Sequence, residues 1–406
     1  MTLNCRSCLH SKLNLLWKLS DAPYGDFFES KQSAALNVKK QILEIGECEK
    51  CKLLQLMENP DLESLHKKYL YRSKLTVGLD HYYENHLDFI TSRIRKKKKS
   101  AIDIGCNDGQ FLNALIAKGF EVVGVDPAKE LLPELCNFGF HFVPAFFNSE
   151  LAEKILREIG EFTLVSANYT LANVTNVKDF LEGVVKIMDR EGYFSIITGY
   201  HPDQFTLNMF DYISHDHISY FSLETIDKCL NQVGLSIVDS FRSELKGGSL
   251  HILAQKKKRQ GKQNVSKRVN YIKQREEWLW QSNSYEILQL KNRIEEQKLN
   301  LMDKLNQIKE PMLGVGASVN TSYLVNEFNL GQIISYLVDD DSSKWGTYNP
   351  YYGIPVLPFS DKKVGDFKHA IILSWQHTNI LINRLKQSDF CGELIVPLPK
   401  LRVLQI

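Results

Sequence analysis

The fold of this chain is indicated by the stretch AIDIGCNDG, residues 101–109. Residues 101–104 are typical of a short buried strand, and the segment after them contains Gly105 and Gly109. Gly105 lets the backbone turn sharply, and Gly109 lets a ligand approach the helix that follows. A strand, a glycine turn and a helix in this order are typical of the ligand-binding edge of a doubly wound α/β domain.

The residues on both sides of this stretch continue the alternation of strand and helix. Residues 120–126 form a second strand candidate that ends in an acid. Further strand candidates, separated by helical stretches, are residues 140–145, 162–167 and 193–198. Alternation at this spacing predicts a parallel sheet in a doubly wound domain.

A carboxylate, Asp126, ends the second strand, 21 residues after Gly105. In such a fold, a carboxylate at this place can accept hydrogen bonds from both ribose hydroxyls of a nucleoside. The loop lacks the G-x-G-x-x-G pattern that holds a pyrophosphate, which favours S-adenosylmethionine over a dinucleotide. A glycine turn without a ligand is the alternative. The candidate cofactor-binding residues are Asp103, Gly105, Asn107, Asp108, Gly109, Asp126 and Asn168.

Four of the eight cysteines form two C-x2-C pairs, Cys5 with Cys8 and Cys48 with Cys51. Two such pairs can offer four thiolates in tetrahedral geometry to Zn²⁺, whereas unrelated buried thiols are the alternative. The 39 residues between the pairs must hold structure of their own. Because four thiolates leave no open coordination position, we expect a structural zinc ion and not a catalytic one.

The composition is that of an ordinary soluble globular protein, with 43% hydrophobic and 24% charged residues. A net charge of +2, from 50 basic and 48 acidic residues, argues against nucleic acid as the main partner. No run of about 18 uncharged apolar residues occurs, and the first residues do not resemble a cleavable signal. We therefore expect a cytoplasmic protein with no membrane partner, either a monomer or a homodimer.

A second α/β series follows a helical stretch. Residues 264–309 have helical periodicity, and Pro311 ends the helix. Residues 312–316, MLGVG, are typical of a strand followed by a glycine turn, and Asp339 follows the next strand candidate, residues 333–338. Taken alone, this part is a second nucleotide-type fold.

In this order, the motifs resemble those of the sugar C-methyltransferases. The stretch DIGCNDG, residues 103–109, resembles the methyltransferase loop of that family, and the two C-x2-C pairs resemble its zinc knuckles. The resemblance continues in YLYRS at 69–73, in SHDHISYFS at 214–222 and in GIPV at 353–356. It therefore extends over nearly the whole chain.

The resemblance implies an α/β protein in three parts. Residues 1–62 form a small zinc-binding module, and residues 63–255 form an S-adenosylmethionine-dependent methyltransferase domain with the class I Rossmann-like fold. Residues 256–406 form a long helix and a second, C-terminal Rossmann-like α/β domain. The resemblance implies that this last domain packs on the methyltransferase domain and helps to hold the nucleotide part of the substrate, and a simple scaffold is the alternative.

The resemblance also implies the substrate and the reaction. In the family, the substrate is a nucleotide-linked keto-deoxysugar, a histidine removes a proton beside the carbonyl, and the enolate attacks the methyl group of S-adenosylmethionine. The family motif tyrosine-histidine-glutamate-histidine falls on residues 214–217, which implies His217 as the base and Asp216 as its orienting carboxylate. The other candidate catalytic residues are His215, Tyr71 and Asn173.

Two positions depart from the family pattern. Ser214 stands where the family has a tyrosine, and Asn173 stands where it has a histidine. Asparagine can donate a hydrogen bond to an oxyanion but cannot carry a proton. The alternatives are therefore O- or N-methyl transfer on a related nucleotide sugar, and a degenerate homologue that binds a nucleotide sugar without activity.

Overall fold

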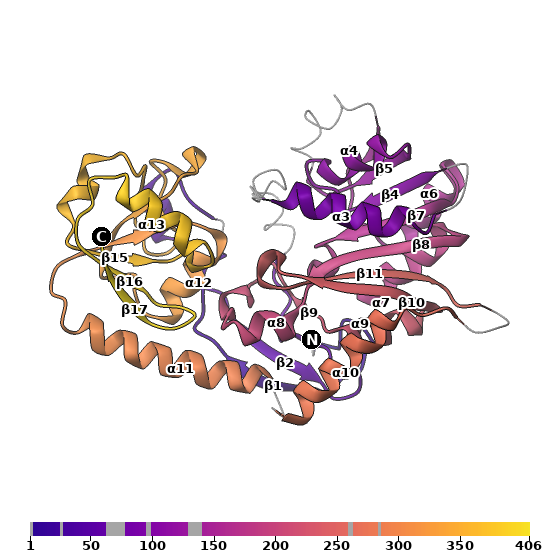
Figure 1. The fold of residues 1–406 in the computed structure, drawn as a ribbon, viewed down its shortest axis with the longest axis horizontal. Helices are drawn as coiled ribbons and strands as arrows, with labels where there is room; N and C mark the ends of the chain where they lie inside the picture. Colours follow the sequence, from indigo (N-terminus) through magenta and orange to yellow (C-terminus); the bar gives the residue numbers. More distant parts are fainter. Residues whose placement is uncertain are drawn as a thin grey trace.

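The strands of the chain form three sheets, seen in a computed structural model that describes residues 3–24, 27–61, 78–94, 99–128, 140–258, 263–282 and 286–406. Figure 1 shows the C-terminal domain in orange and yellow on the left and the central domain on the right, with the N-terminal strands below and between them. Among the described residues, no helix has the length and apolar character needed to cross a membrane.

The N-terminal module is a small antiparallel sheet, and the central part of the chain contributes its fourth strand. Its order is β1-β2-β3-β9, with β9 coming from far along the chain. One end, with Cys5 and Cys48, packs into the core of the central domain, whereas Trp17 and Ile45 pack into the core shared with the C-terminal domain. The elements are β1 Leu13–Lys18, α1 Gln32–Leu36, β2 Glu44–Cys48, β3 Leu54–Leu56 and β9 Ser219–Tyr220.

The central domain has a seven-stranded sheet in the order β6-β5-β4-β7-β8-β11-β10. The strands from β6 to β8 pair in parallel, whereas β11 is antiparallel to both β8 and β10. This is the class I methyltransferase order, and it confirms the predicted fold class. The strands are β4 Ser100–Ile104, β5 Glu121–Val125, β6 His141–Val143, β7 Phe162–Asn168, β8 Met188–Gly199, β10 Leu235–Ser243 and β11 Ser249–Lys256.

Helices cover this sheet and leave the carboxyl ends of its central strands open. Strand β7 is buried at every residue, as expected for a parallel strand with both faces covered. The turns after β4, β5 and β7 therefore meet at one edge of the sheet, where ligands bind in such folds. The helices are α3 Leu79–Thr91, α4 Gln110–Ala117, α6 Ser149–Glu158, η4 Leu171–Asn173, α7 Val177–Ile187, α8 His201–Thr206, η5 Phe210–Tyr212, α9 Leu223–Gln232 and η6 Leu245–Gly247.

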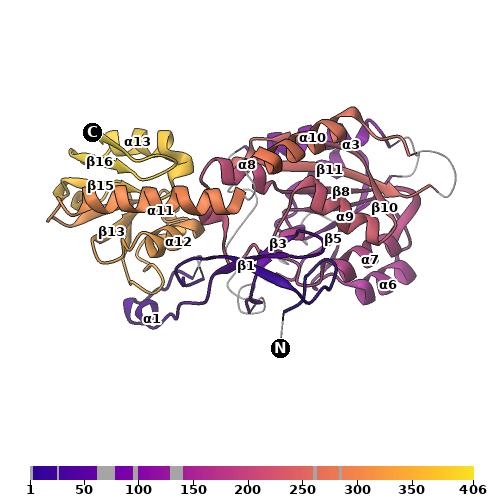
Figure 2. The ribbon, with the colours of Figure 1, turned by 90° about the horizontal axis from the view of Figure 1, so that it is seen from below.

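Two helices stand where one long helix was predicted. Helix α10, Lys267–Ser282, packs on α9 and β10 of the central domain. Helix α11, Glu286–Leu305, contacts α8 and β1 and then leads into the C-terminal domain (Figure 2). Its buried stripe consists of Ile287, Leu290, Ile294 and Leu301, at helical spacing. Helix α11 therefore joins all three parts.

The C-terminal domain is a second Rossmann-like unit, as predicted. Its sheet has the order β14-β13-β12-β15-β16-β17, parallel except for β17. Its strands are β12 Met312–Val315, β13 Ile334–Val338, β14 Val356–Leu357, β15 His369–Ile372, β16 Glu393–Val396 and β17 Arg402–Gln405. Its helices are α12 Val319–Glu327, η7 Ser342–Lys344, η8 Lys362–Asp366, η9 Trp375–His377 and α13 Thr378–Lys386.

Candidate active site

The glycine loop after β4 has a backbone that requires glycine. Gly105 and Gly109 have φ angles of 76° and 77°, in the left-handed region. The backbone N–H of Gly105 donates to the carbonyl of Val125 at 2.7 Å, which ties the loop to the end of β5. A Cβ atom at Gly105 would lie 2.1 Å from Thr170 Oγ1. The loop can therefore approach the next turn, after β7, only because this residue is glycine.

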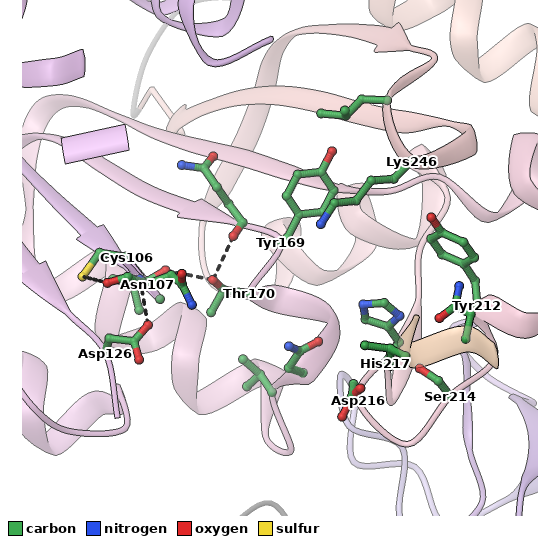
Figure 3. A pocket seen from close by; sticks show the side chains of 18 of the residues that line it. Cys106, Asn107, Asp126, Tyr169, Thr170, Tyr212, Ser214, Asp216, His217 and Lys246 are labelled. Atoms are coloured by element: carbon green, nitrogen blue, oxygen red, sulfur yellow. Dashed lines mark hydrogen bonds between the residues drawn. The ribbon is translucent and has the colours of Figure 1, made fainter. Parts of the chain in front are cut away.

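The carboxylate of Asp126 is held by backbone donors at the edge of a cavity. Its Oδ2 accepts from the N–H of Asn107, and its Oδ1 accepts from the N–H of Ala128, both at 2.9 Å. Asp126 is nonetheless one of the residues that line the cavity (Figure 3). Each carboxylate oxygen has a second lone pair, so a fixed carboxylate of this kind can still accept the hydroxyls of a ribose.

Asp103 and Asn168 lie beside each other at the ends of β4 and β7. Asp103 Oδ1 accepts from Ser166 Oγ at 2.6 Å and from Asn168 Nδ2 at 3.3 Å. Burial raises the pKa of Asp103 to about 7, against the lowering effect of the Ser166 hydroxyl. Asn168 Oδ1 is buried and has no hydrogen-bond partner among the described residues. An ammonium group would satisfy this amide oxygen and favour the ionised carboxylate.

One cavity, of about 1240 Å³, extends from this loop to the C-terminal domain. Asp103, Gly105, Asn107, Asp126 and Asn168 line it, whereas Asp108 and Gly109 are not among its lining residues. Opposite them, the C-terminal domain contributes Ser318, Asn320, Lys344 and His377, among others. Beside the cavity, Asp211 of η5 accepts from Trp375 Nε1 at 3.0 Å and from Gln376 Nε2 at 2.9 Å, which fixes the two domains to each other.

His217 lies in the same cavity, on the other side from Asp126 (Figure 3). Its ring stacks on Tyr212 at a centroid distance of 6.2 Å. Burial and the charge of Lys246 lower the pKa of His217 to about 4, and a hydrogen bond to the backbone of Tyr212 opposes them. Asp216, Ser214 and Asn173 also line this part of the cavity. His217 is therefore neutral at pH 7, the state in which an imidazole can accept a proton.

His215 lies outside the lining of this cavity and joins three parts of the chain. Its Nε2 donates to the carbonyl of Ile42, and its Nδ1 accepts from the hydroxyl of Tyr323, both at 3.1 Å. The ring also packs edge-on against Tyr24 at 5.1 Å. Burial lowers the pKa of His215 to about 4, so the ring is neutral. Tyr71, the remaining candidate catalytic residue, is outside the described residues.

Two further residues of the cavity were not identified from the sequence. Lys246 and Tyr169 both line it, and Lys246 Nζ lies 4.2 Å from the centre of the Tyr169 ring. Both residues have positive φ angles, of 51° and 54°. The glycine pair after Lys246, Gly247-Gly248, marked a turn in the sequence, but nothing in the sequence placed that turn beside Asp126 or His217.

The four cysteines of the N-terminal module converge as their spacing predicted. The Sγ atoms of Cys5 and Cys51 are 3.4 Å apart, those of Cys8 and Cys48 are 3.6 Å apart, and all four lie within 4.8 Å of one another. Sulfurs bound to one zinc ion at about 2.3 Å are separated by about 3.8 Å. The four sulfurs could therefore hold a zinc ion, and four thiolates would close its coordination.

Comparison with known proteins identifies the two large domains. Residues 79–240 match the family model for a methyltransferase domain, and residues 244–399 match that for a C-methyltransferase C-terminal domain. The C-methyltransferase NovU of Streptomyces niveus is 25% identical over 404 residues, which cover 98% of this chain and 96% of that protein. The chain therefore has the two domains that these family models describe. It is an S-adenosylmethionine-dependent methyltransferase.

Solved structures similar to part of this methyltransferase were also found. One is magnesium protoporphyrin IX methyltransferase from Synechocystis PCC 6803 with bound SAM, which is 15% identical with a TM-score of 0.34, over 45% of this chain and 81% of that one. Another is the plantazolicin methyltransferase BpumL with SAH, 13% identical with a TM-score of 0.39, over 49% of this chain and 92% of that one.

The role of Asp126 in the methyltransferase can be tested against a matched residue. Asp126→Asn is expected to weaken binding of S-adenosylhomocysteine by about 10- to 100-fold, because a hydrogen bond to a charged group contributes about 1.5–3 kcal/mol. Isothermal titration calorimetry would measure this affinity. In the C-terminal domain, Asp339 accepts from the N–H groups of Ala317 and Asp341 at 2.6 and 2.8 Å, in the same arrangement. Asp339→Asn should leave the affinity unchanged, and a loss equal to that of Asp126→Asn would contradict the assignment.

Proposed function

We propose that this methyltransferase transfers a methyl group to a carbon atom of a nucleotide-linked keto-deoxysugar, with His217 as the base. The observation that supports this most is the shared cavity, which has the Asp126 loop on one side and His217 on the other. A neutral histidine facing the methyl-donor side of a cavity is the arrangement that proton removal followed by transfer requires. The relative NovU is a C-methyltransferase by name.

The residues around the glycine loop fit S-adenosylmethionine. In this proposal, Asp126 accepts the ribose hydroxyls, and the unsatisfied Asn168 amide oxygen accepts the ammonium group beside Asp103. Gly105 and Asn107 line the cavity and would contact the ligand, whereas Asp108 and Gly109 would support the loop from outside the cavity lining. When bound, S-adenosylmethionine supplies a methyl group on a sulfonium ion, which is electrophilic without help from a metal.

The cavity has room for a second ligand beside the cofactor. Its volume of about 1240 Å³ exceeds the range of roughly 300–1,000 Å³ that is usual for a single small molecule. We place the sugar between Tyr169 and His217. The nucleotide part would then lie toward Ser318, Asn320 and Lys344 of the C-terminal domain, where a hydroxyl, an amide N–H and an ammonium group suit phosphate oxygens.

In this proposal, His217 takes the proton from the carbon beside the carbonyl. The electron pair left on that carbon is delocalised onto the carbonyl oxygen as an enolate, and the carbon is then the nucleophile. The backbone of Tyr212 accepts a hydrogen bond from the His217 ring and favours its protonated form. Asp216, the residue before His217, lines the same cavity and would orient the base, and Asn173 can donate to the sugar or its oxyanion.

The remaining candidates have supporting roles in this proposal. His215 holds the 214–217 turn against Ile42 and Tyr323, so it positions His217 and does not touch the substrate. Zinc bound by the four cysteines is structural. Tyr71 remains a proposed substrate contact on the resemblance alone.

Deuterium exchange tests this function directly. The protein would be incubated in D2O with nucleotide-linked 4-keto-deoxysugars, with S-adenosylhomocysteine or S-adenosylmethionine, and followed by NMR. We expect deuterium at the carbon beside the carbonyl with S-adenosylhomocysteine, and a methyl group at that carbon with S-adenosylmethionine. Methylation of an oxygen or nitrogen without exchange would replace this function by O- or N-methyl transfer. Neither exchange nor methylation would leave a nucleotide-sugar-binding homologue.

A further inference from the structure

Lys246 is held in an uncommon backbone conformation at the wall of the cavity. Its φ and ψ angles are 51° and 38°, in the left-handed region that residues with a side chain avoid. The turn is fixed from both sides, because Gln204 Nε2 donates to the Lys246 carbonyl at 3.1 Å and Tyr200 N–H donates to the Gly248 carbonyl at 3.0 Å. Strained residues of this kind are often found at functional sites.

The glycines after Lys246 are packed too closely to allow a different turn. A Cβ atom at Gly247 would lie 1.9 Å from Met209 Sδ, and one at Gly248 would lie 2.6 Å from the Asp203 Cβ. The turn is therefore packed against Asp203 of α8 and Met209, the residue before η5. This packing fixes the direction in which Lys246 leaves the backbone.

The side chain of Lys246 extends over the ring of Tyr169 (Figure 3). Its Nζ lies 4.2 Å from the ring centre, a favourable position for a cation. The Tyr169 hydroxyl is paired with Ser249 Oγ at 2.7 Å, which holds the ring in place. Figure 3 shows Tyr169 and the end of the Lys246 side chain between the Asp126 loop and His217.

The charge of Lys246 also acts on His217, since it is the second cause, after burial, of that histidine's lowered pKa. The acids Asp216 and Glu244 line the same cavity. Proton removal from a carbon beside a carbonyl places negative charge on the carbonyl oxygen, and a fixed cation in a partly dry site stabilises that charge strongly. The same charge of Lys246, near the base, also keeps the His217 imidazole neutral before it takes the proton.

We propose that Lys246 is the group that stabilises the enolate oxygen during methyl transfer, an inference that rests on the proposed function. His217 forms a bond to the proton as the carbon–hydrogen bond breaks, and the electron pair moves onto the carbonyl oxygen, which faces the Lys246 ammonium group. When the carbon forms its bond to the methyl group, the carbonyl is restored. The sulfonium leaves as a neutral thioether, and the proton stays on His217.

The test compares Lys246→Met with Lys246→Arg in the full-length protein. Removing one oxyanion donor slows catalysis by about 100- to 1,000-fold, so Lys246→Met should slow deuterium exchange with S-adenosylhomocysteine by at least about 100-fold. Lys246→Arg keeps the charge and should remain within about tenfold of the wild type. The affinity for S-adenosylhomocysteine should change in neither variant. The surface substitution Lys186→Met, in a side chain that is 42% exposed, is the control.

A second measurement does not depend on the substrate. NMR titration of the His217 ring should show a higher pKa in Lys246→Met than in the wild type, and an unchanged pKa in Lys246→Arg. Equal exchange rates in wild type and Lys246→Met, or equal losses in the Met and Arg variants, would overturn the role of Lys246 while leaving the proposed function intact. A wild-type protein that exchanges no deuterium would overturn both.

Discussion

Replacing His217 by alanine is expected to slow methyl transfer and deuterium exchange by about 1,000-fold, because a positioned general base usually contributes 10²- to 10⁴-fold. The affinity for S-adenosylhomocysteine should stay within about threefold, since Asp126 lies on the other side of the cavity. Rates with a nucleotide-linked keto-deoxysugar, together with calorimetric titration of the cofactor product, would show both. Full activity in His217→Ala would remove this residue from the mechanism.

The lowered pKa of His217 also predicts how activity changes with pH. In the proposed mechanism His217 acts as a base when its ring is neutral, and burial with the Lys246 charge lowers its pKa to about 4. Activity should therefore be nearly independent of His217 titration above pH about 5 and fall as the pH decreases through about 4. The acid limb should be absent from the residual activity of His217→Ala.

His215, two residues away, provides the matched control. Its ring bonds Ile42 and Tyr323 and lies outside the cavity lining, so His215→Ala should lower the free energy of unfolding by about 2–4 kcal/mol through unsatisfied buried partners. His217→Ala should unfold at nearly the wild-type temperature. Equal changes in the unfolding temperature of the two variants would contradict the assignment of His215 to packing and of His217 to catalysis.

The parts of the fold that the sequence predicted are those specified by neighbouring residues. The turn at Gly105 follows a strand and needs a positive φ angle, and Asp126 directly follows the next strand, so the local sequence predicted both positions. The two cysteine pairs could be recognised for the same reason, because the two cysteines of each C-x2-C pair lie in one turn. The second Rossmann-like unit was recognisable for the same reason, from a strand and a glycine turn at 312–316.

The sequence did not reveal contacts between segments far apart in the chain. Strand β9 has two residues, too few for a periodic pattern, and it is a strand only because β3 pairs with it. Lys246 lies in the cavity because Gly247 and Gly248 pack against Met209 and Asp203. The sequence predicted a single helix because its apolar periodicity is similar before and after residues 283–285, whereas the structure has two helices, α10 and α11.

Removing the zinc ion that the four cysteines are proposed to hold is expected to abolish exchange and methyl transfer, although this site lies outside the cavity lining. Cys48 and Cys51 close the turn between β2 and β3, and β3 pairs with β9 through Leu54 and Tyr220. The N–H of Leu56 donates to the carbonyl of Ile218, the residue after His217, at 3.0 Å. The metal would thus hold the sheet to which the His217 loop is attached.

Arg6, which lies between Cys5 and Cys8 in the sequence, ties the cysteine site to β3. Its side chain is 2% exposed and donates to the carbonyls of Leu56 and Glu58 at 2.7 and 2.8 Å. A structural zinc ion contributes about 10–16 kcal/mol to the folding of a small module, so its loss would release Arg6 and β3 together. The central domain has its own core and should still bind S-adenosylhomocysteine.

The experiment therefore separates two readouts after treatment with a zinc chelator or in Cys48→Ser. Metal content should fall from about one zinc ion per chain, and amide exchange should increase at residues 54–56 and 218–220, whereas cofactor affinity should change by less than about tenfold. Cys391→Ser, at an exposed cysteine of the C-terminal domain, should keep its metal and its activity. A metal-free protein with full activity would contradict this prediction. It would show that the position of the His217 loop does not depend on the cysteine module.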